Sequence, residues 1–178
     1  LSLRKIAEGT TSLIGIDPEG WIWKLYKGEN LCAEPGCPCN KRNNSDGAKH
    51  EYEISSIIHM NQTRQDETFV GEHFIEAVFA GEGHFLMINN GFDQVSFLKM
   101  KQTKGETFSQ FIKNNSGTPT TAYIDKFKNY MIQGLEILEF LKSKQIVHMD
   151  FHESNAIINV NPENGKESIV LIDFGLAE

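Results

Sequence analysis

The chain has 178 residues, enough for one domain of ordinary size, and its 39% hydrophobic and 23% charged residues argue against disorder along the whole chain. Acidic residues outnumber basic residues by 24 to 17, and the net charge of −7 argues against a broad nucleic-acid-binding surface. No apolar run approaches the roughly 20 residues of a membrane-spanning helix, and no signal peptide is visible. We therefore expect a globular protein with no nucleic acid partner and no membrane segment.

Three β-strands are predicted before residue 27. Hydrophobic alternation covers residues 3–6, a short apolar run covers residues 12–16, and alternation around Lys24 covers residues 21–26. The sequence Asp-Pro-Glu-Gly at residues 17–20 is typical of a turn between the last two of these strands.

A long loop insertion is predicted over residues 27–49, where glycine, proline and asparagine accumulate. It contains all three cysteines of the chain, Cys32, Cys37 and Cys39. An odd number of cysteines in one segment favours reduced loop thiols in a cytoplasmic protein over a secreted disulfide framework. A local zinc site or a disulfide is the alternative interpretation.

Between residues 50 and 105 the sequence predicts one helix and three strands. The helix is expected over residues 51–61, where isoleucines share one face. The strands are expected over residues 74–79, 85–88 and 95–100. Glycine and asparagine at residues 81–83 and 89–91 are expected to separate them.

The remaining residues predict two helices followed by short strands. A short helix is expected over residues 107–113 and a long one over residues 123–142. The apolar residues of the long helix recur at helical spacing: Ile124, Phe127, Met131, Leu135, Leu138 and Leu141. Strand-like runs follow at residues 146–150, 156–160 and 169–172. A strand-rich front with one helix, followed by a helical region, a loop and a hairpin, predicts an α+β fold with two lobes.

Two polar motifs near the end of the sequence suggest a chemistry. They are HMDFHESN at residues 148–155 and IDFG at residues 172–175. A strand-turn-strand hairpin between them would bring Asp150, Asn155 and Asp173 around one point. One carboxylate could then take the proton of an incoming hydroxyl. The second carboxylate and the amide oxygen could hold Mg²⁺ against nucleotide phosphates, because hard cations take oxygen ligands.

These motifs resemble those of the protein kinases. HMDFHESN is similar to H-R-D-L-x-x-x-N and IDFG to D-F-G, and the two aspartates are spaced 23 positions apart. The resemblance implies a two-lobed protein kinase-like fold, with a strand-rich N-lobe over residues 1–101 that has one main helix and a truncated helical C-lobe over residues 102–178. It also implies that Asp150 is the catalytic base and that Asn155 and Asp173 bind Mg²⁺.

The N-terminal half resembles the ATP-binding parts of the same family. IAEGTTSLIGI is similar to a glycine-rich loop that keeps only its central Gly9, and WIWKLY resembles the V-A-I-K strand, which makes Lys24 the phosphate-contacting lysine. VSFLKMKQTKGETFSQFI resembles the segment that links the two lobes. This implies that Met100 is the gatekeeper and that the backbone of Lys101 to Thr103 meets the adenine.

A lysine in this role needs a carboxylate on the following helix. Glu51 and Glu53 both qualify by position. At about 100° per residue, Glu51 lies closer to the centre of the isoleucine face of the helix. We therefore expect Glu51 to pair with Lys24 and Glu53 to be a solvated surface charge.

Three histidine and methionine positions bear on the resemblance. His148 packs beneath the loop in the kinase family and does no chemistry there. Met149 replaces the arginine that meets a phosphorylated activation loop, which implies activity without such phosphorylation. His152 replaces a lysine of the serine/threonine kinases, and its imidazole could approach the γ-phosphate. The pattern HxDxHxxN is also similar to aminoglycoside and choline kinases.

The leading hypothesis is ATP- and Mg²⁺-dependent phosphoryl transfer to Ser or Thr hydroxyls of a folded protein substrate. The alternatives are a small-molecule phosphotransferase and a nucleotide-binding pseudokinase scaffold. The chain ends at Glu178, three residues after the D-F-G glycine, so either a natural tail follows or the kinase is a reduced one. It resembles small bacterial secreted effector and viral kinases, which implies a host protein as substrate and a host cytosol as an alternative location. The sequence does not indicate the oligomeric state.

Overall fold

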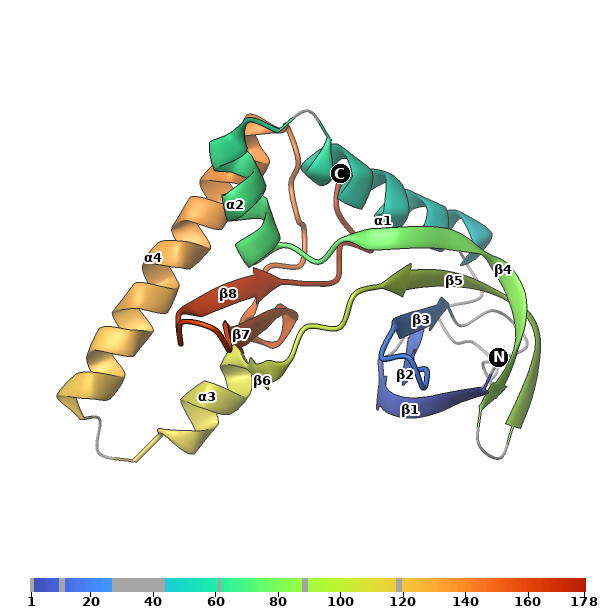
Figure 1. Ribbon diagram of the computed structural model, residues 1–178, viewed down its shortest axis with the longest axis horizontal. Helices are drawn as coiled ribbons and strands as arrows, with labels where there is room; N and C mark the ends of the chain where they lie inside the picture. Colours follow the sequence, from blue (N-terminus) through green and yellow to red (C-terminus); the bar gives the residue numbers. More distant parts are fainter. Residues whose placement is uncertain (1, 10–11, 27–43, 61, 88–89, 118–119) are drawn as a thin grey trace. The chain divides into compact units, whose positions relative to one another are not determined.

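The computed structural model describes residues 2–9, 12–26, 44–60, 62–87, 90–117 and 120–178 (Figure 1). These residues form two compact units. The first consists of Leu1–Ser56 and Glu76–Gln102, and the second consists of Ile57–Ile75 and Thr103–Glu178. Both units contain helices and strands, so the predicted α+β class is confirmed.

Five strands form a closed barrel in the first unit. They are β1 (Ser2–Glu8), β2 (Ser12–Ile16), β3 (Ile22–Tyr26), β4 (Ala77–Met87) and β5 (Asn90–Met100). The strand order is β1-β2-β3-β5-β4, and β1 closes the barrel by pairing with β4 in parallel. The three strands predicted before residue 27 are confirmed, and β2 covers the predicted residues.

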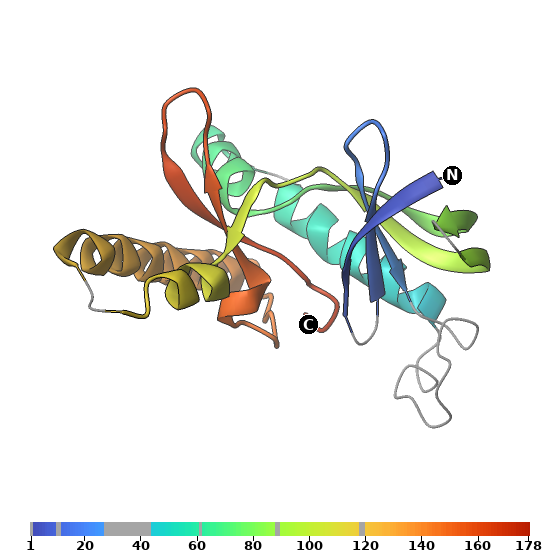
Figure 2. The same ribbon diagram turned by 90° about the horizontal axis from the view of Figure 1, so that it is seen from below.

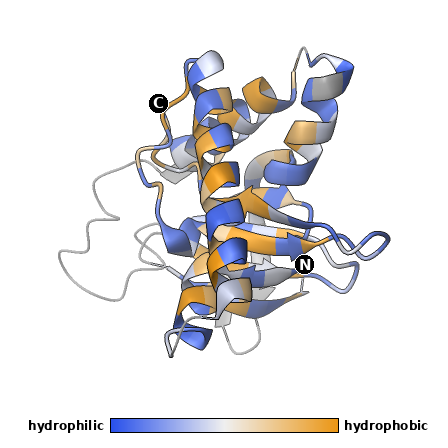
Figure 3. Ribbon diagram, turned by 90° about the vertical axis from the view of Figure 1, so that its left-hand side faces the viewer, coloured by the Kyte–Doolittle hydropathy of each residue, from blue (hydrophilic) through white to orange (hydrophobic). Residues whose placement is uncertain are grey.

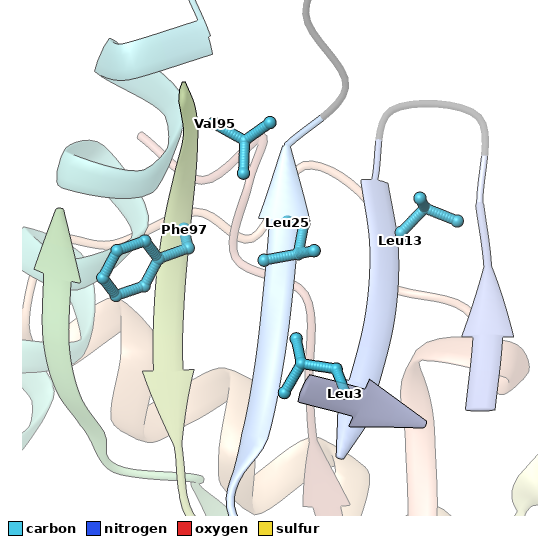
Figure 4. Packing of buried hydrophobic residues seen from close by; sticks show 5 residues of the cluster. All are labelled: Leu3, Leu13, Leu25, Val95 and Phe97. Atoms are coloured by element: carbon cyan, nitrogen blue, oxygen red, sulfur yellow. The ribbon is translucent and has the colours of Figure 1, made fainter. Parts of the chain in front are cut away.

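Alternate side chains of these strands form a buried apolar core, because successive residues of a strand point to opposite faces. Its members are Leu3, Leu13, Leu25, Val95 and Phe97 (Figure 4). Trp23 packs against this cluster, with its ring centroid 5.1 Å from that of Phe97.

The opposite face of β3 and β5 packs against helix α1 (Asn44–His59). Lys24 is the register partner of Leu98. Tyr26, Leu98 and Ala48 form one buried cluster, and Met100 packs against it. The two-residue period of the strands therefore places Lys24, Tyr26 and Met100 on the same face of the sheet.

The predicted turn between β2 and β3 is confirmed. Gly20 donates its N–H to the carbonyl of Asp17 at 3.0 Å and has a φ of 88°, which favours glycine. The Asp17 carboxylate accepts bonds from the N–H groups of Glu19 and Trp21 and from the indole of Trp23, at 3.0, 2.9 and 2.8 Å. Burial raises the pKa of Asp17, but these hydrogen bonds outweigh burial and leave the pKa below its ordinary value.

The second unit combines a small sheet with three helices and a short 3₁₀ turn. Its elements are α2 (Arg64–His73), β6 (Gly105–Thr107), α3 (Phe108–Asn114), α4 (Thr121–Ser143), η2 (Glu153–Asn155), β7 (Ala156–Val160) and β8 (Glu167–Leu171). The sheet order is β6-β7-β8, and β7 and β8 form a hairpin (Figure 2). At Gly105, a Cβ would lie 1.9 Å from the carbonyl oxygen of Ile158, so only glycine allows β6 to approach β7.

Helix α2 was not predicted, and it changes the expected boundary between the units. Residues 57–75 belong to the second unit, although the N-lobe was expected to span residues 1–101 without a gap. Val70, His73 and Phe74 are buried. His73 Nδ1 lies 2.7 Å from the carbonyl oxygen of Ile169 in β8, and Phe74 forms a bridge to Leu171. These partners lie nearly a hundred residues further along the chain, where no local pattern reveals them.

Two predicted boundaries in the first unit are wrong. Helix α1 begins at Asn44 rather than at residue 51, so the predicted insertion does not extend to residue 49. Residues 27–43, with the three cysteines, lie outside the described residues. The strands expected at 74–79 and 85–88 are replaced by the single strand β4, because Gly81 and Gly83 pair with Phe97 and Val95 of β5 and continue the ladder.

The second unit also departs from prediction in three places. Strand β6 was not predicted, and the segment expected as a strand at 146–150 is irregular. Only Leu141 of the six apolar residues expected to share a face of α4 is fully buried, together with Tyr130 and Ile137. Met131 and Leu135 are 46% and 64% exposed, and orange bands of apolar residues alternate with blue bands of polar residues along this helix (Figure 3). Contacts with β8 determine which side of α4 is buried. The Tyr130 hydroxyl of α4 donates to the carboxylate of Glu167 in β8 at 2.6 Å.

Within the described residues, no helix combines the length and the apolar character needed to cross a membrane.

Candidate functional site

The loop that carries the first polar motif begins at a defined helix end. Gln145, just after α4, has a φ of 60°. Ile146 donates its N–H to the carbonyl of Leu141 at 2.9 Å, and Gln145 donates to Lys142 at 3.0 Å. This is the Schellman pattern, which ends a helix and turns the chain in a fixed direction. Because Ile146 is buried after this turn, the chain enters residues 147–155 from a fixed point.

His148 supports the loop from beneath and is 2% exposed. Its Nε2 lies 3.1 Å from the carbonyl oxygen of Ile172, and its Nδ1 accepts the N–H of Asp150 at 3.3 Å. The neutral ring with its proton on Nε2 satisfies both contacts. The ring also meets the ring of Phe174 edge to face at 4.7 Å. The expectation that His148 packs beneath the loop is confirmed.

Asp150 presents a carboxylate that is held but open to solvent. The preceding residue, Met149, has a φ of 64°, an uncommon conformation for a non-glycine residue. Asn155 donates its amide N–H groups to the carbonyl oxygen of Asp150 at 3.1 Å and to its Oδ2 at 3.0 Å. The Asp150 side chain remains 43% exposed. A substrate group can therefore reach a carboxylate whose direction is set by its neighbour.

Asn155 joins this loop to the second polar motif. It is 8% exposed, and its carbonyl oxygen accepts the N–H of Ile172 at 2.9 Å. Asp173 follows directly, is exposed, and has a φ of 65°. Its Oδ1 accepts the N–H of Gly175 at 3.4 Å. The sequence predicts that a hairpin brings Asp150, Asn155 and Asp173 around one point, and the backbone bond from Ile172 to Asn155 and the amide bonds from Asn155 to Asp150 link the segments that carry these residues.

Left-handed backbone conformations gather at this site. Among the described non-glycine residues, positive φ values occur at Gln145, Met149 and Asp173. Met149 and Asp173 lie within the two motifs, and Gln145 lies at the helix end three residues before the first motif. Such conformations cost about 1–3 kcal/mol each and persist where the surrounding structure holds them, which is common at functional sites.

A buried ion pair lies on the helix-facing side of the barrel in the first unit. Lys24 Nζ lies 2.7 Å from Glu51 Oε2, and the two side chains are 5% and 6% exposed. Glu53 instead lies 3.8 Å from Lys49 on the surface, with both side chains largely exposed. The pairing expected from the helical wheel, with Glu51 rather than Glu53, is confirmed. Its role in catalysis stays a prediction.

Other predicted nucleotide contacts lie in the first unit or at its edge. Gly9 follows β1 and donates its N–H to the carbonyl of Ser12 at 2.9 Å, so a hairpin joins β1 and β2. Met100 ends β5 on the face that carries Lys24. The N–H of Lys101 points to the carbonyl of Glu76 at 3.4 Å, and Thr103 lies in an irregular segment. Contacts of these residues with a nucleotide stay predictions.

His152 has a structural role that the sequence did not suggest. It is the N-cap of η2, and its Nδ1 accepts the N–H of Ser154 at 3.2 Å. Its Nε2 lies 3.6 Å from Asp150 Oδ2, and its side chain is 43% exposed. The hydrogen bond from the Ser154 N–H fixes the orientation of the His152 ring, and Nε2 of the ring faces the Asp150 carboxylate.

The donor set of this end of the second unit fits a hard cation. Both amide N–H groups of Asn155 are taken by Asp150, which leaves the amide oxygen outside these bonds. The Asp173 side chain is exposed, and Asp173 directly follows Ile172, whose N–H is bonded to the carbonyl oxygen of Asn155. One amide oxygen and one carboxylate suit Mg²⁺, which binds few protein ligands and completes its shell with water and phosphate. Among the described residues no group of three or more His, Cys, Asp or Glu side chains forms a metal cage.

Tyr26 is a site residue that the sequence reasoning missed. Its hydroxyl donates to Glu51 Oε2, the same atom that Lys24 contacts. The period of two along a strand was the available signal, because it places residue 26 on the face of residue 24.

Comparison with known proteins identifies no family for this chain. No protein-family model matches the chain, and no curated protein has a similar sequence. Lys24 and Glu51 belong to the first unit, and Asp150, Asn155 and Asp173 belong to the second.

Proposed function

We propose that this protein is a two-lobed, kinase-like enzyme that transfers the γ-phosphoryl group of ATP, with Mg²⁺, to Ser or Thr hydroxyls of a folded protein substrate. The observation that carries the proposal is the open Asp150 carboxylate, oriented by the buried amide of Asn155. Phosphoryl transfer depends mainly on positioning and on charge stabilisation, and a carboxylate directed at the incoming hydroxyl supplies the first.

Asp150 accepts the proton of the attacking hydroxyl in this proposal. A general base must reach the proton that it takes, and exposure of Asp150 allows that approach. Asn155 and Asp173 hold Mg²⁺, which neutralises charge on the phosphate oxygens when it is bound. The hydrogen bonds from Asn155 to Asp150 link the metal-binding amide to the base, so a shift of one side chain moves the other.

Lys24 contacts the phosphates of the nucleotide, and Glu51 orients its ammonium group. A buried ammonium needs a paired carboxylate, because an unpaired charge in a low-dielectric environment is costly. The 2.7 Å contact with Glu51 meets that requirement. The resemblance to protein kinases suggests further nucleotide contacts. We propose that they are made by Gly9, Met100 and the backbone from Lys101 to Thr103.

A small-molecule phosphotransferase is the second candidate, and one observation favours it. The exposed His152 Nε2 lies 3.6 Å from the Asp150 carboxylate, where it could approach a phosphate or a small acceptor. A pseudokinase scaffold is less well supported. Such a scaffold has no chemical need for the buried lysine pair together with the oriented Asp150 and its neighbours.

The proposed substrate is a folded protein that positions its own hydroxyl near Asp150. For a secreted effector of this kind the substrate would be a host protein and the location a host cytosol. For an enzyme that acts in its own cell, the location would be the cytoplasm.

The test is a screen for phosphate acceptance from γ-labelled ATP with Mg²⁺. Folded proteins, short Ser/Thr peptides, amino sugars and choline are offered to the wild type and to Asp150→Asn. Label on Ser or Thr of folded proteins, absent with the variant, supports the proposal. Label on the small alcohols or sugars favours the second candidate. ATP binding without transfer to any acceptor favours the scaffold.

A further inference from the structure

Tyr26 holds a position that links strand β3 to helix α1. It is the last residue of β3 and is 7% exposed. Its hydroxyl donates to Glu51 Oε2, while Lys24 Nζ reaches the same oxygen at 2.7 Å. One carboxylate oxygen therefore receives two donors from a single strand, two residues apart and on the same face.

The ring of Tyr26 is held as firmly as its hydroxyl. Tyr26 forms a buried cluster with Ala48 of α1 and Leu98 of β5. A Cβ at Gly47 would lie 3.2 Å from a carbon of the Tyr26 ring, so the absence of a side chain there lets the ring pack closely on the first turns of α1. Lys24 Nζ also lies 5.3 Å from the centre of this ring, within the range of a cation–π contact. Tyr26 thus contacts the helix, the carboxylate and the ammonium group.

We propose that Tyr26 is a positioning residue, which fixes the Glu51 carboxylate and thereby holds α1 and the Lys24 ammonium in one arrangement. A glutamate side chain has several rotatable bonds, and a single ion pair leaves its carboxylate free to turn about the contact. A second, charge-assisted hydrogen bond to the same oxygen removes that freedom. The catalytic consequence rests on the proposed function, because it requires Lys24 to contact the nucleotide.

Two of the donors to the Glu51 carboxylate are residues of β3 itself. Strand β3 therefore helps to hold α1 in place through this carboxylate.

Tyr26→Phe is the direct test, because it removes only the hydroxyl and keeps the ring. Tyr52→Phe is the matched control: it makes the same change on α1, in a residue that packs against the same cluster. We expect Tyr26→Phe to lower kcat about tenfold and to change the KM for ATP by less than about twofold, and Tyr52→Phe to leave both unchanged.

The Glu51→Gln background separates positioning from general stabilisation. If Tyr26 acts through the Glu51 carboxylate, adding Tyr26→Phe to Glu51→Gln causes little further loss. The same tenfold loss in both backgrounds would overturn the proposal, and so would a Tyr26→Phe variant with the wild-type kcat.

Amide hydrogen exchange of α1 provides a readout that does not need activity. Tyr26→Phe should speed exchange in α1 severalfold while α4 is unchanged, and Tyr52→Phe should leave both helices as in the wild type. If the wild type transfers no phosphate but Tyr26→Phe still loosens α1, the proposed function fails and the positioning role of Tyr26 stands. Equal α1 exchange in Tyr26→Phe and wild type would overturn the role, whether or not the enzyme is active.

Discussion

The two units hold their charged residues in opposite ways. In the first unit, Lys24 and Glu51 are 5% and 6% exposed and contact each other at 2.7 Å. In the second unit, Asp150 is 43% exposed and is oriented by an amide rather than by a cation at contact distance. Buried charges must satisfy each other, because desolvation leaves them no alternative. An exposed carboxylate keeps oxygen lone pairs that can accept a proton, and a substrate hydroxyl can reach it. A general base requires both.

The means of positioning differ as well. The first unit uses side chains, with β3 supplying Lys24 and Tyr26 and α1 supplying Glu51. The second unit combines one side chain, the Asn155 amide that orients Asp150, with the backbone: left-handed conformations at Met149 and Asp173 and a bond from Ile172 to Asn155. Substitutions in the first unit should therefore affect stability together with activity, and substitutions in the second should affect activity almost alone.

Asp150→Asn should give the largest change in rate. Loss of the base should lower kcat by about a thousandfold, which is the usual scale of general base catalysis. The melting temperature should change little, because the side chain is exposed and an asparagine oxygen can still accept the bond from Asn155. Asp125→Asn, the same change at an exposed position of α4, is the control and should leave kcat unchanged. A wild-type rate for Asp150→Asn would refute the assignment of the base.

Lys24→Ala and Glu51→Ala should each lower the free energy of unfolding by about 3–5 kcal/mol, because each removes the oppositely charged contact of a buried charge. Both should also lose most activity. The double variant should be little worse than either single variant, since no charge is then left without its partner. Urea unfolding measures these free energies. Glu53→Ala removes the surface pair with Lys49 and should cost less than about 0.5 kcal/mol. Additive losses in the double variant would contradict the coupling.

Asp173→Asn should weaken binding of ATP with Mg²⁺ about tenfold or more, because Mg²⁺ prefers a carboxylate oxygen. Asn155→Ala should act in the same direction with a smaller effect on binding. Titration calorimetry with and without Mg²⁺ measures both. The effect should disappear when Mg²⁺ is omitted, and equal Mg²⁺-dependent affinities for variant and wild type would remove Asp173 from the metal site.

Asp17 in the first unit combines the properties of the two cases. Its carboxylate is buried, as that of Glu51 is, but it is held by three N–H donors, much as Asp150 is held by an amide. Its pKa is lowered from 3.8 in the folded protein: burial opposes this, but the hydrogen bonds of Trp23, Trp21 and Glu19 prevail. The stabilisation is therefore present above pH 3.8 and is lost as the pH falls through the folded pKa. Asp17→Asn should lower stability by about 1–3 kcal/mol at pH 7. Its free energy of unfolding should also change less than that of the wild type between pH 5 and pH 3, as measured by urea unfolding.

Treatment with a phosphatase should have the smallest effect. Met149 is 59% exposed and cannot bind a phosphate as an arginine would. The initial rate of treated enzyme should match that of untreated enzyme within about twofold. A large loss that preincubation with ATP restores would show that a phosphorylated residue is required after all.

Local patterns in the sequence predicted much of the fold. The short apolar run at residues 12–16 and the strand-like run at residues 156–160 correspond to β2 and β7 at the predicted bounds. The turn at Asp17–Gly20 and the choice of Glu51 over Glu53 also followed from local rules. These features depend on the strand period, on turn chemistry and on the helical wheel, all of which act within a few residues.

Contacts between distant segments decided the remainder. Helix α2 belongs to the second unit because His73 and Phe74 meet β8, nearly a hundred residues away. β4 runs through two glycines because β5 pairs with them. The buried side of α4 faces β8, so Leu135 is exposed although it follows the helical apolar spacing. Local patterns in the sequence identified Lys24 and Glu51. The hydrogen bond from the Tyr26 hydroxyl to the Glu51 oxygen that Lys24 contacts depends on how closely α1 packs on β3. That distance is set by side-chain volume at Gly47 and Ala48, which only the packed structure brings against the ring.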